Sequence, residues 1–482
     1  MRHFISNQRL TLGIFFLIAI VLAGSSYLLL YRLGAEPLHD YDEATYAEIS
    51  LESGLSHQYV VPTFLGNEFF RKPPLLFWLI DVDNKIISSS ELAARLPSAL
   101  SALGLIILVM RLVYEATKSG FAAVFGGAVL MTTSAFIEPA RQVRLDLLVS
   151  FFSLAAVYAF LRALDDRHRH CFLGFGIFLG FAVLAKGPLA IFTIVAVLTL
   201  AAIYKRFEWI RDRYFWGGVL LFLLIALPWH FYETIRFGFT FWNVYLGDQV
   251  FSRMGQTLFS GPTNGDYISY LFAFAIPWIV VFGASVVAGG FLWKRMRKKT
   301  QALFVASVIT VISIVLIFFS AKTKAGSYLI SLYPFMAVAV AVSVFEIYRL
   351  LHTRARIFLI LSCVILSSVG FELSIFNGFH TNPYYATIDA LAMQEKGIGQ
   401  TLRAQHASQF YVYNATTLGS IMFYSRILHP ISLGPGGMPP IGSFILYQTT
   451  EAAQLHAVYP TLSFISDYEG SLLTLASVAS ED

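Results

Sequence analysis

The feature that most constrains this chain is a series of apolar runs, each near 20 residues long, that repeats over most of its length. About 20 apolar residues in a helix cross the hydrocarbon core of a bilayer, where only helices and closed barrels satisfy their own backbone. Of the 482 residues 57% are hydrophobic and 13% are charged, whereas soluble domains have roughly 25% charged residues. The sequence therefore predicts an α-helical polytopic membrane protein.

The runs predict about eleven transmembrane helices, with boundaries accurate to a few residues. The first run is longer than the core of a typical signal peptide and no small-residue cleavage site follows it, so we expect it to be retained. The expected spans are residues 10–31, 91–113, 119–136, 142–163, 171–186, 188–204, 214–232, 268–293, 302–320, 327–348 and 357–374.

Lys and Arg predict the orientation, because they gather in six loops that alternate along the chain if the helix count is eleven. Such basic loops normally remain in the cytoplasm. The rule places residues 33–90 and the C-terminal tail on the extracytoplasmic (periplasmic) side of the plasma (inner) membrane. It also explains the net charge of +5 without a nucleic-acid partner. The basic stretches are Arg2 with Arg9, "RLVYEATK", "RALDDRHRH", "KRFEWIRDR", "KRMRKK" and "RLLHTRAR".

The tail changes character after about residue 376, where polar residues, Gly and Pro interrupt short apolar segments. "QFYVYN", "GSIMFY" and "SFILYQ" have the composition of strands, and "GPGGMPP" is typical of a turn. We therefore divide the chain into a transmembrane domain, residues 1–375, and a small soluble extracytoplasmic α/β domain, residues 376–482.

The unusual polar residues of the membrane region fall almost entirely on the predicted outer side. Ionisable side chains near the ends of membrane helices are costly, which makes them candidates for function. A transporter would place them near the bilayer midplane, so their clustering favours chemistry on a substrate from the outer leaflet. They are Asp42, Glu43, Arg71, Lys72, Arg141, Asp146, Lys186, His230, Arg253, Lys322, Lys324 and Tyr328.

Two stretches of the first outer loop carry much of this signal. In "HDYDEATYAEI", Asp40 and Glu43 have the spacing of a capping box at a helix start, which leaves Asp42 unexplained. In "NEFFRKPPLLFWL", the Pro-Pro pair keeps Arg71 and Lys72 on irregular backbone before an amphipathic segment. Basic groups can neutralise a leaving phosphate and a carboxylate can accept a hydroxyl proton, so both requirements of sugar transfer from a lipid phosphate are present.

The motifs "DEATYAEI", "FFRKPPLLFWL", "AKGP", "PWH" and "FFSAKTKAGSYLISLYP" together resemble a known series. It is that of the polyprenyl-phosphate-sugar-dependent glycosyltransferases of the GT-C superfamily, related to the aminoarabinose transferase of lipid A and to protein O-mannosyltransferases. The resemblance covers roughly residues 10–350. It implies a GT-C-like fold with external juxtamembrane helices and an enzyme that moves a hexose or pentose from a polyprenyl-phosphate donor to a lipid A or other envelope glycolipid acceptor.

The resemblance also implies roles for single residues. Asp42 matches an acidic position of the first outer loop that serves as base or orients the acceptor, and Asp146 matches a second acidic position; both are candidate catalytic residues. Glu43 is expected to be structural, and Lys186 of "AKGP" is expected to support the site.

Three residues match the positions that bind the carrier phosphate: Lys72, Arg253 and Tyr328. One departure is informative, because the position before the lysine is usually acidic in the aminoarabinose transferases and can bind a metal, whereas here it is Arg71. The arginine argues against a divalent metal at that position and is expected to add a phosphate contact; whether the protein uses a metal elsewhere stays open.

Structural roles compete with each functional one. Asp42 can interact with a helix dipole, Lys72 and Arg71 can extend to lipid headgroups, and Asp146 can form an ion pair with Arg141 or Arg144. Two other functions also remain: a protein O-glycosyltransferase that uses the same donor class, and a transporter or flippase of lipid-linked sugars.

Overall fold

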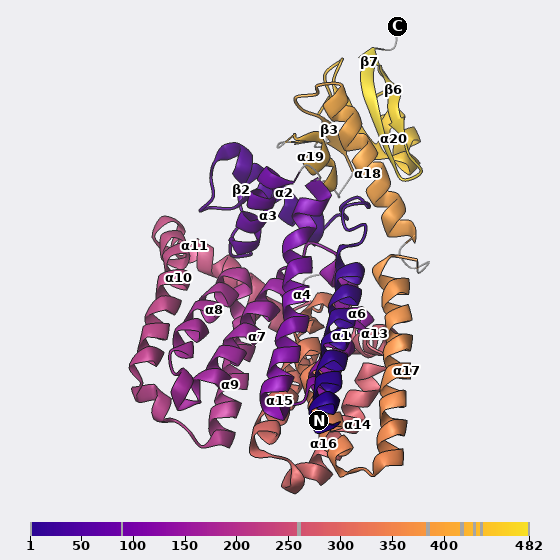
Figure 1. Cartoon of the computed structure of the whole chain (residues 1–482). Coiled ribbons are helices and arrows are strands. Elements are labelled where there is room, and N and C mark those ends of the chain that lie inside the picture. The colour runs from indigo at the N-terminus through magenta and orange to yellow at the C-terminus, as the bar shows by residue number, and fades with distance from the viewer. Residues whose placement is uncertain are drawn as a thin grey trace. The chain divides into compact units, whose positions relative to one another are not determined.

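The structure of the chain is a computed structural model that describes residues 2–87, 90–257, 262–381, 386–414, 419–427, 430–433 and 437–480 (Figure 1). The chain forms two compact units. The first comprises Met1–Tyr31, Phe70–Leu75 and Pro97–Thr381, and the second comprises Arg32–Phe69, Leu76–Leu96 and Asn382–Asp482. The second unit thus combines the tail with two segments of the first outer loop.

Long apolar helices make up the first unit, in agreement with the expected membrane class. Among the described residues, nine helices are long and apolar enough to cross a bilayer, or ten if the bent pair of α5 and α6 counts as one span. The helices of the membrane region, including those too short to cross a bilayer, are α1 (Arg2–Leu30), α4 (Ser90–Thr117), α5 (Gly120–Met131), α6 (Ser134–Ala140), α7 (Leu145–Ala163), α8 (Cys171–Lys186), α9 (Ile191–Tyr204), α10 (Arg213–Phe237), α11 (Phe239–Trp242), α13 (Asn264–Phe274), α14 (Trp278–Leu292), α15 (Lys298–Ser320), α16 (Leu332–Leu350) and α17 (Thr353–Gly378).

The apolar run formed by α8 and α9 reverses direction between its two helices. Lys186, at the end of α8, reaches Asp146 in the first turn of α7. Arg206, just past α9, donates instead to the carbonyl of Leu164 beyond the other end of α7. Arg169, just before α8, binds the same carboxylate of Asp166 that lies 3.5 Å from Arg206, so the start of α8 and the end of α9 lie at the same end of α7. A straight helix of 34 residues would separate these two ends by about 50 Å. The two runs expected at 171–186 and 188–204 are therefore separate antiparallel helices, while the number of spans in a bilayer stays a prediction.

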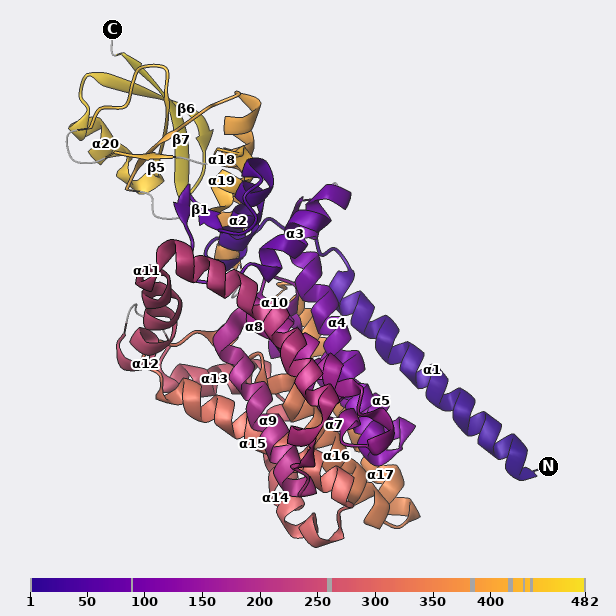
Figure 2. The ribbon, with the colours of Figure 1, turned by 90° about the vertical axis from the view of Figure 1, so that its left-hand side faces the viewer.

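Close backbone contact joins α8 to its neighbour α10, beside which it lies in Figure 2. A Cβ atom added at Gly176 would lie 1.8 Å from the carbonyl oxygen of Gly218, and one added at Gly218 would lie 2.2 Å from that of Phe172. Small residues commonly let membrane helices approach in this way. This close contact between α8 and α10 fixes the position of α8, whose last residue is the candidate Lys186.

The second unit contains a five-stranded sheet in the order β4-β3-β5-β7-β6. Strand β3 is parallel to β4 and β5, whereas β7 is antiparallel to β5 and β6. The elements of this unit are α2 (Asp42–Ser56), β1 (Thr63–Phe64), β2 (Asn67–Glu68), α3 (Leu75–Ile86), α18 (Ala386–Ala404), β3 (Tyr411–Tyr413), α19 (Gly419–Ser425), β4 (Ile431–Ser432), β5 (Phe444–Gln448), α20 (Ala452–Val458), β6 (Leu462–Glu469) and β7 (Leu473–Ser480).

Alternating side chains give the sheet a core on each face. Val412 and Leu446 pack with α18 and α19 on one face, whereas Tyr411 and Ile445 pack with Leu455 of α20 on the other. This period of two is the one expected for a strand. The tail thus contains the expected mixture of strands and helices, whereas its bounds at residues 376–482 and its extracytoplasmic location stay predictions.

Two of the three expected strands are correct, since β3 lies in "QFYVYN" and β5 in "SFILYQ". The third is wrong: "GSIMFY" forms the helix α19, whose seven residues are all buried. A short apolar run without alternation does not distinguish a strand from a buried helix. The expected turn "GPGGMPP" lies partly outside the described residues.

Candidate active site

Four of the expected residues form one connected group in the first unit. The ammonium of Lys186 lies 2.8 Å from the carboxylate of Asp146, and the two side chains are 15% and 5% exposed. The same ammonium lies over the ring of Tyr328, 5.6 Å from its centroid. Arg253 in turn donates a hydrogen bond from Nη1 to the hydroxyl of Tyr328. Residues that span 182 positions of the sequence, from 146 to 328, are thus linked by direct contacts.

Lys72 forms a hydrogen bond with a residue of the helical turn that precedes Arg253. Its ammonium donates to Oε1 of Gln249 at 2.5 Å. Gln249 belongs to the π-helix η4 (Asn243–Ser252), which continues directly into the short helix α12 (Arg253–Gly255). Because Gln249 and Arg253 are four residues apart on adjoining helical turns, this arrangement places two basic side chains along one segment.

Backbone contacts fix the segment that carries Arg253 against the loop that precedes Tyr328. The amide of Thr323 donates to the carbonyl of Arg253 at 2.9 Å, and its hydroxyl donates to the carbonyl of Gln256 at 2.6 Å. Tyr267 holds the same loop, since its hydroxyl donates to the carbonyl of Ala325 and accepts from the amide of that residue. The contact between Arg253 and Tyr328 is therefore set by several independent hydrogen bonds.

The charges of this group suit an anion. Lys72, Lys186 and Arg253 supply three cations, and Asp146 balances one of them. The Nε–H group of Arg253 is buried and makes no hydrogen bond to a described residue, so it can donate to a bound anion. A phosphate group can accept several such hydrogen bonds, and charge-assisted bonds are the stronger kind.

Two expectations for single residues can now be refined. The ion pair of Asp146 is made with Lys186, whereas Arg141 donates to the carbonyl of Leu28 and lies over the ring of Phe379. Arg71 is exposed and makes no hydrogen bond or ion pair to a described residue. Its guanidinium offers no ligand atom to a cation, so a metal does not fit the position that is acidic in the resembled family.

Asp42 and Glu43 belong to the second unit, where they differ sharply in exposure. Asp42 is exposed at the start of α2, whereas Glu43 is buried and binds Arg95 through both carboxylate oxygens, at 2.9 and 3.0 Å. Arg95 also donates to the carbonyls of Leu33, Glu36 and Pro37, so that it makes five hydrogen bonds in all. Glu43 thus has a structural partner in Arg95, whereas Asp42 lies at the surface.

The expected capping box was wrong. The residue before α2 is Tyr41, which has a φ of 66° and makes no side-chain cap, although Glu43 does reach back to the amide of His39 at 2.9 Å. The carboxylate of Asp40 accepts hydrogen bonds from the amide of Tyr41 and from those of Ser420 and Gly419, at the start of α19. Burial raises the pKa of Asp40, and these hydrogen bonds oppose that rise.

Sequence reasoning missed two residues of these networks. Gln249 lies one helical turn before Arg253, a spacing that offered a signal. Arg95 lies near the start of an apolar run, where an ionisable residue is itself unusual. Its distance of 52 residues from Glu43 concealed the pairing.

Known proteins with similar sequences agree with the fold described above. A family profile described as dolichyl-phosphate-mannose-protein mannosyltransferase matches residues 71–232. The undecaprenyl phosphate-alpha-4-amino-4-deoxy-L-arabinose arabinosyl transferase of Enterobacter sp. is 25% identical over 67% of this chain and 58% of its own length. That of Shewanella sediminis is 27% identical over 71% of this chain and 62% of its own. The chain therefore matches 58–62% of the length of these curated relatives.

Solved structures extend the similarity over most of the chain. The crystal structure of ArnT from Cupriavidus metallidurans bound to undecaprenyl phosphate has a TM-score of 0.75, at 16% identity, and covers 96% of this chain and 99% of that one. The oligosaccharyltransferase of Archaeoglobus fulgidus has a TM-score of 0.55 at 13% identity and covers 96% of this chain and 73% of that one. At these identities the solved structures show the fold alone, which is similar to that of the ArnT crystal structure and agrees with the expected fold class.

Proposed function

We propose that this protein is a glycosyltransferase that moves one sugar from a polyprenyl-phosphate carrier to a lipid A-type or other envelope glycolipid, at the outer face of the plasma membrane. The observation that carries the proposal is the connected group of Asp146, Lys186, Tyr328 and Arg253, together with Lys72, which binds Gln249 one helical turn before Arg253. Relatives named as arabinosyl transferases and an ArnT structure bound to undecaprenyl phosphate support the donor class.

The leaving group explains why the site needs an excess of cations. As the bond between the anomeric carbon and the phosphate oxygen breaks, negative charge grows on the polyprenyl phosphate. Arg253 and Lys72 neutralise that charge, Tyr328 orients the guanidinium, and Arg71 adds a further cation. Groups already held in position stabilise such charge without reorganising at the moment of reaction.

The acceptor requires a carboxylate. In the proposed mechanism the acceptor hydroxyl loses its proton to Asp42, and its oxygen attacks the anomeric carbon from the side opposite the phosphate. Asp146 assists while Lys186 holds its orientation. A single displacement of this kind inverts the anomeric centre and needs no covalent intermediate. If the acceptor is itself a phosphate, Asp42 positions it and removes no proton.

The test is a mass-spectrometric comparison of envelope lipids from cells that express wild-type protein or Asp42→Asn at matched levels. We expect one glycolipid to lose a single sugar mass in the variant, while its precursor and the lipid-linked donor accumulate. A sugar lost from a protein instead of a lipid would identify a protein O-glycosyltransferase. Identical lipid and protein profiles would contradict the proposal, and unchanged carrier turnover would favour a flippase.

A further inference from the structure

A polar cavity lies in the first unit at the opposite end of α7 from the candidate active site. It has a volume of about 380 Å³. Arg162, one of its lining residues, is 16 positions after Asp146 on the same helix, which corresponds to roughly 24 Å. The positive-inside pattern assigns this end to the cytoplasm. The carrier-phosphate site proposed above does not account for the cavity.

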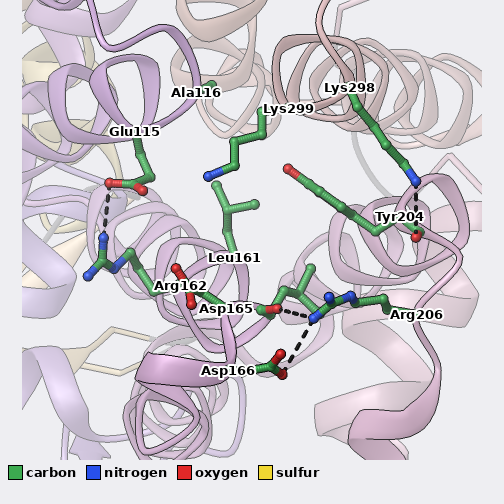
Figure 3. Close-up of a pocket in the computed structure, with 11 residues that line it drawn as sticks. Glu115, Ala116, Leu161, Arg162, Asp165, Asp166, Tyr204, Arg206, Lys298 and Lys299 are labelled. Carbon is green, nitrogen blue, oxygen red and sulfur yellow. Dashed lines mark hydrogen bonds and ion pairs between the residues drawn. The ribbon is translucent and has the colours of Figure 1, made fainter.

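Four basic and three acidic side chains line this cavity (Figure 3). Glu115 is bound by Arg162 at 3.1 Å and by Lys118 at 3.0 Å. Asp166 is bound by Arg169 at 2.7 Å and by Arg206 at 3.5 Å. The third acid, Asp165, accepts from the amide of Arg167 at 3.1 Å and lies 3.7 Å from the ring of His168. These ion pairs and hydrogen bonds do not involve the two lysines of the cavity, Lys298 and Lys299, although the charge of Lys299 adds to the larger effect of the Arg167 amide in lowering the pKa of Asp165.

Lys298 and Lys299 have no carboxylate within ion-pair distance among the described residues. Lys298 reaches the carbonyl of Tyr204 at 3.5 Å, and Lys299 makes no hydrogen bond or ion pair to a described residue. Figure 3 shows the ammonium of Lys299 and the hydroxyl of Tyr204 both pointing into the open centre of the cavity. One cation and a hydroxyl donor therefore face the same space, while the ammonium of Lys298 lies at its edge, directed to the carbonyl of Tyr204.

The location of the lysines on their helix is electrostatically unfavourable unless an anion is bound. They are the first two residues of α15, which has no acidic residue in its first turn and no side-chain cap. The N-terminus of a helix carries partial positive charge and unsatisfied amides, which repel cations and attract anions. The orientation rule explains basic residues in this loop, but it does not require them to line a cavity at a helix N-terminus.

We propose that this cavity binds a phosphate group, through Lys298, Lys299, Tyr204 and the first amides of α15. Exposed aromatic residues mark the membrane interface nearby, since Phe207 follows the lining residue Arg206 and Trp293 precedes Lys298 by five positions. Basic pockets between membrane helices on the cytoplasmic side bind the headgroups of anionic lipids. The phosphate can come from such a lipid or from a soluble phosphate, and the experiment separates these sources.

The experiment uses purified full-length protein and a charge-matched control. Lys298→Gln/Lys299→Gln removes the cavity cations, while Lys294→Gln/Arg295→Gln removes the same charge from the same loop outside the cavity lining. Native mass spectrometry counts bound short-chain phosphatidylglycerol and phosphatidylcholine, and calorimetry measures inorganic phosphate. Thermal unfolding checks that both variants are folded.

We expect wild type and the Lys294/Arg295 variant to prefer phosphatidylglycerol to phosphatidylcholine, and the Lys298/Lys299 variant to bind phosphatidylglycerol roughly 10–30-fold more weakly. The same loss for inorganic phosphate, with no lipid preference in wild type, would identify a soluble ligand. Equal binding of phosphatidylglycerol and of inorganic phosphate by wild type and the Lys298/Lys299 variant would overturn the proposal.

Discussion

At the scale of the residue, the polar side chains of the first-unit site differ from ordinary interfacial charges because each is held by a neighbour. Asp146 is held by Lys186, Tyr328 by Arg253, and Lys72 by Gln249. A lysine that only extends to lipid headgroups has no need of such a partner. Fixed donors are what a reaction with a phosphate leaving group requires.

Removal of the guanidinium of Arg253 tests this view of the leaving group. We expect Arg253→Met to lower the rate of sugar transfer roughly 100-fold or more, because a donor to the developing phosphate charge is lost. Initial rates measured at saturating donor give the effect on the chemical step. A wild-type rate in this variant would show that Arg253 does not bind the leaving phosphate.

The hydroxyl of Tyr328 allows a finer test with a matched control. Tyr328→Phe should reduce transfer about 10-fold, the value of one hydrogen bond to a charged group. Tyr333→Phe should have little effect, since the buried hydroxyl of Tyr333 makes no hydrogen bond to a described residue. Equal rates for both variants would show that the Tyr328 hydroxyl has no part in the reaction.

The Glu43–Arg95 pair links protonation to stability. Burial alone would raise the pKa of Glu43, but the charge and hydrogen bonds of Arg95 outweigh it and lower the pKa from 4.5 to about 2. Because the folded state favours the ionised carboxylate, its contribution to stability is complete above pH 4.5. That contribution is lost as the pH falls from 4.5 toward 2.

We expect Glu43→Gln to lower the free energy of unfolding by about 3–5 kcal/mol, since it leaves a buried guanidinium without its counter-charge. The variant should also show less loss of stability than wild type on acidification below pH 4.5. Thermal unfolding in detergent measures both effects. Glu68→Gln, at an exposed position of the same unit, is the control and should change stability by less than about 0.5 kcal/mol. Similar stability in the two variants would contradict the buried-pair account.

At the scale of the element, the contact between α8 and α10 determines where Lys186 lies. The added Cβ of Gly176→Ala would overlap the backbone of Gly218, so the helices must separate. We expect a loss of about 1–3 kcal/mol in stability, typical of overpacking, and a lower melting temperature. Gly283→Ala on α14 has open space around it and should be neutral or slightly stabilising. The same melting temperature in both variants would refute the close contact.

Elements also show where sequence reasoning succeeds. The hydrophobicity of a run of about 20 consecutive residues does not depend on tertiary contacts. The membrane helices and the α8–α9 reversal could therefore be predicted from the sequence. The capping of α2 and the state of "GSIMFY" could not. Asp40 does not form the expected capping box of α2, and its carboxylate also binds the amides of Gly419 and Ser420, about 380 positions away in the sequence. Gln249 was missed for a related reason, since its contact with Lys72 joins separate segments.

At the scale of the whole molecule, the predicted orientation places the first outer loop and the loop after α7 on opposite sides of the membrane. In a background that carries Cys171→Ser and Cys363→Ser, a membrane-impermeant thiol reagent should label Glu68→Cys in cells whose outer membrane has been permeabilised. Asp166→Cys should be labelled only after the inner membrane is opened. The exposed fractions of both residues favour labelling. Labelling of both under the first condition would contradict the predicted orientation.

The central claim is that sugar transfer releases polyprenyl monophosphate from this protein's site. The most direct measurement uses proteoliposomes of purified protein supplied with a lipid extract that contains donor and acceptor, in which both products are quantified by mass spectrometry. We predict one monophosphate released for each sugar transferred, and the loss of both in Arg253→Met. Sugar transfer without monophosphate release, or equal release by wild type and Arg253→Met, would contradict the account.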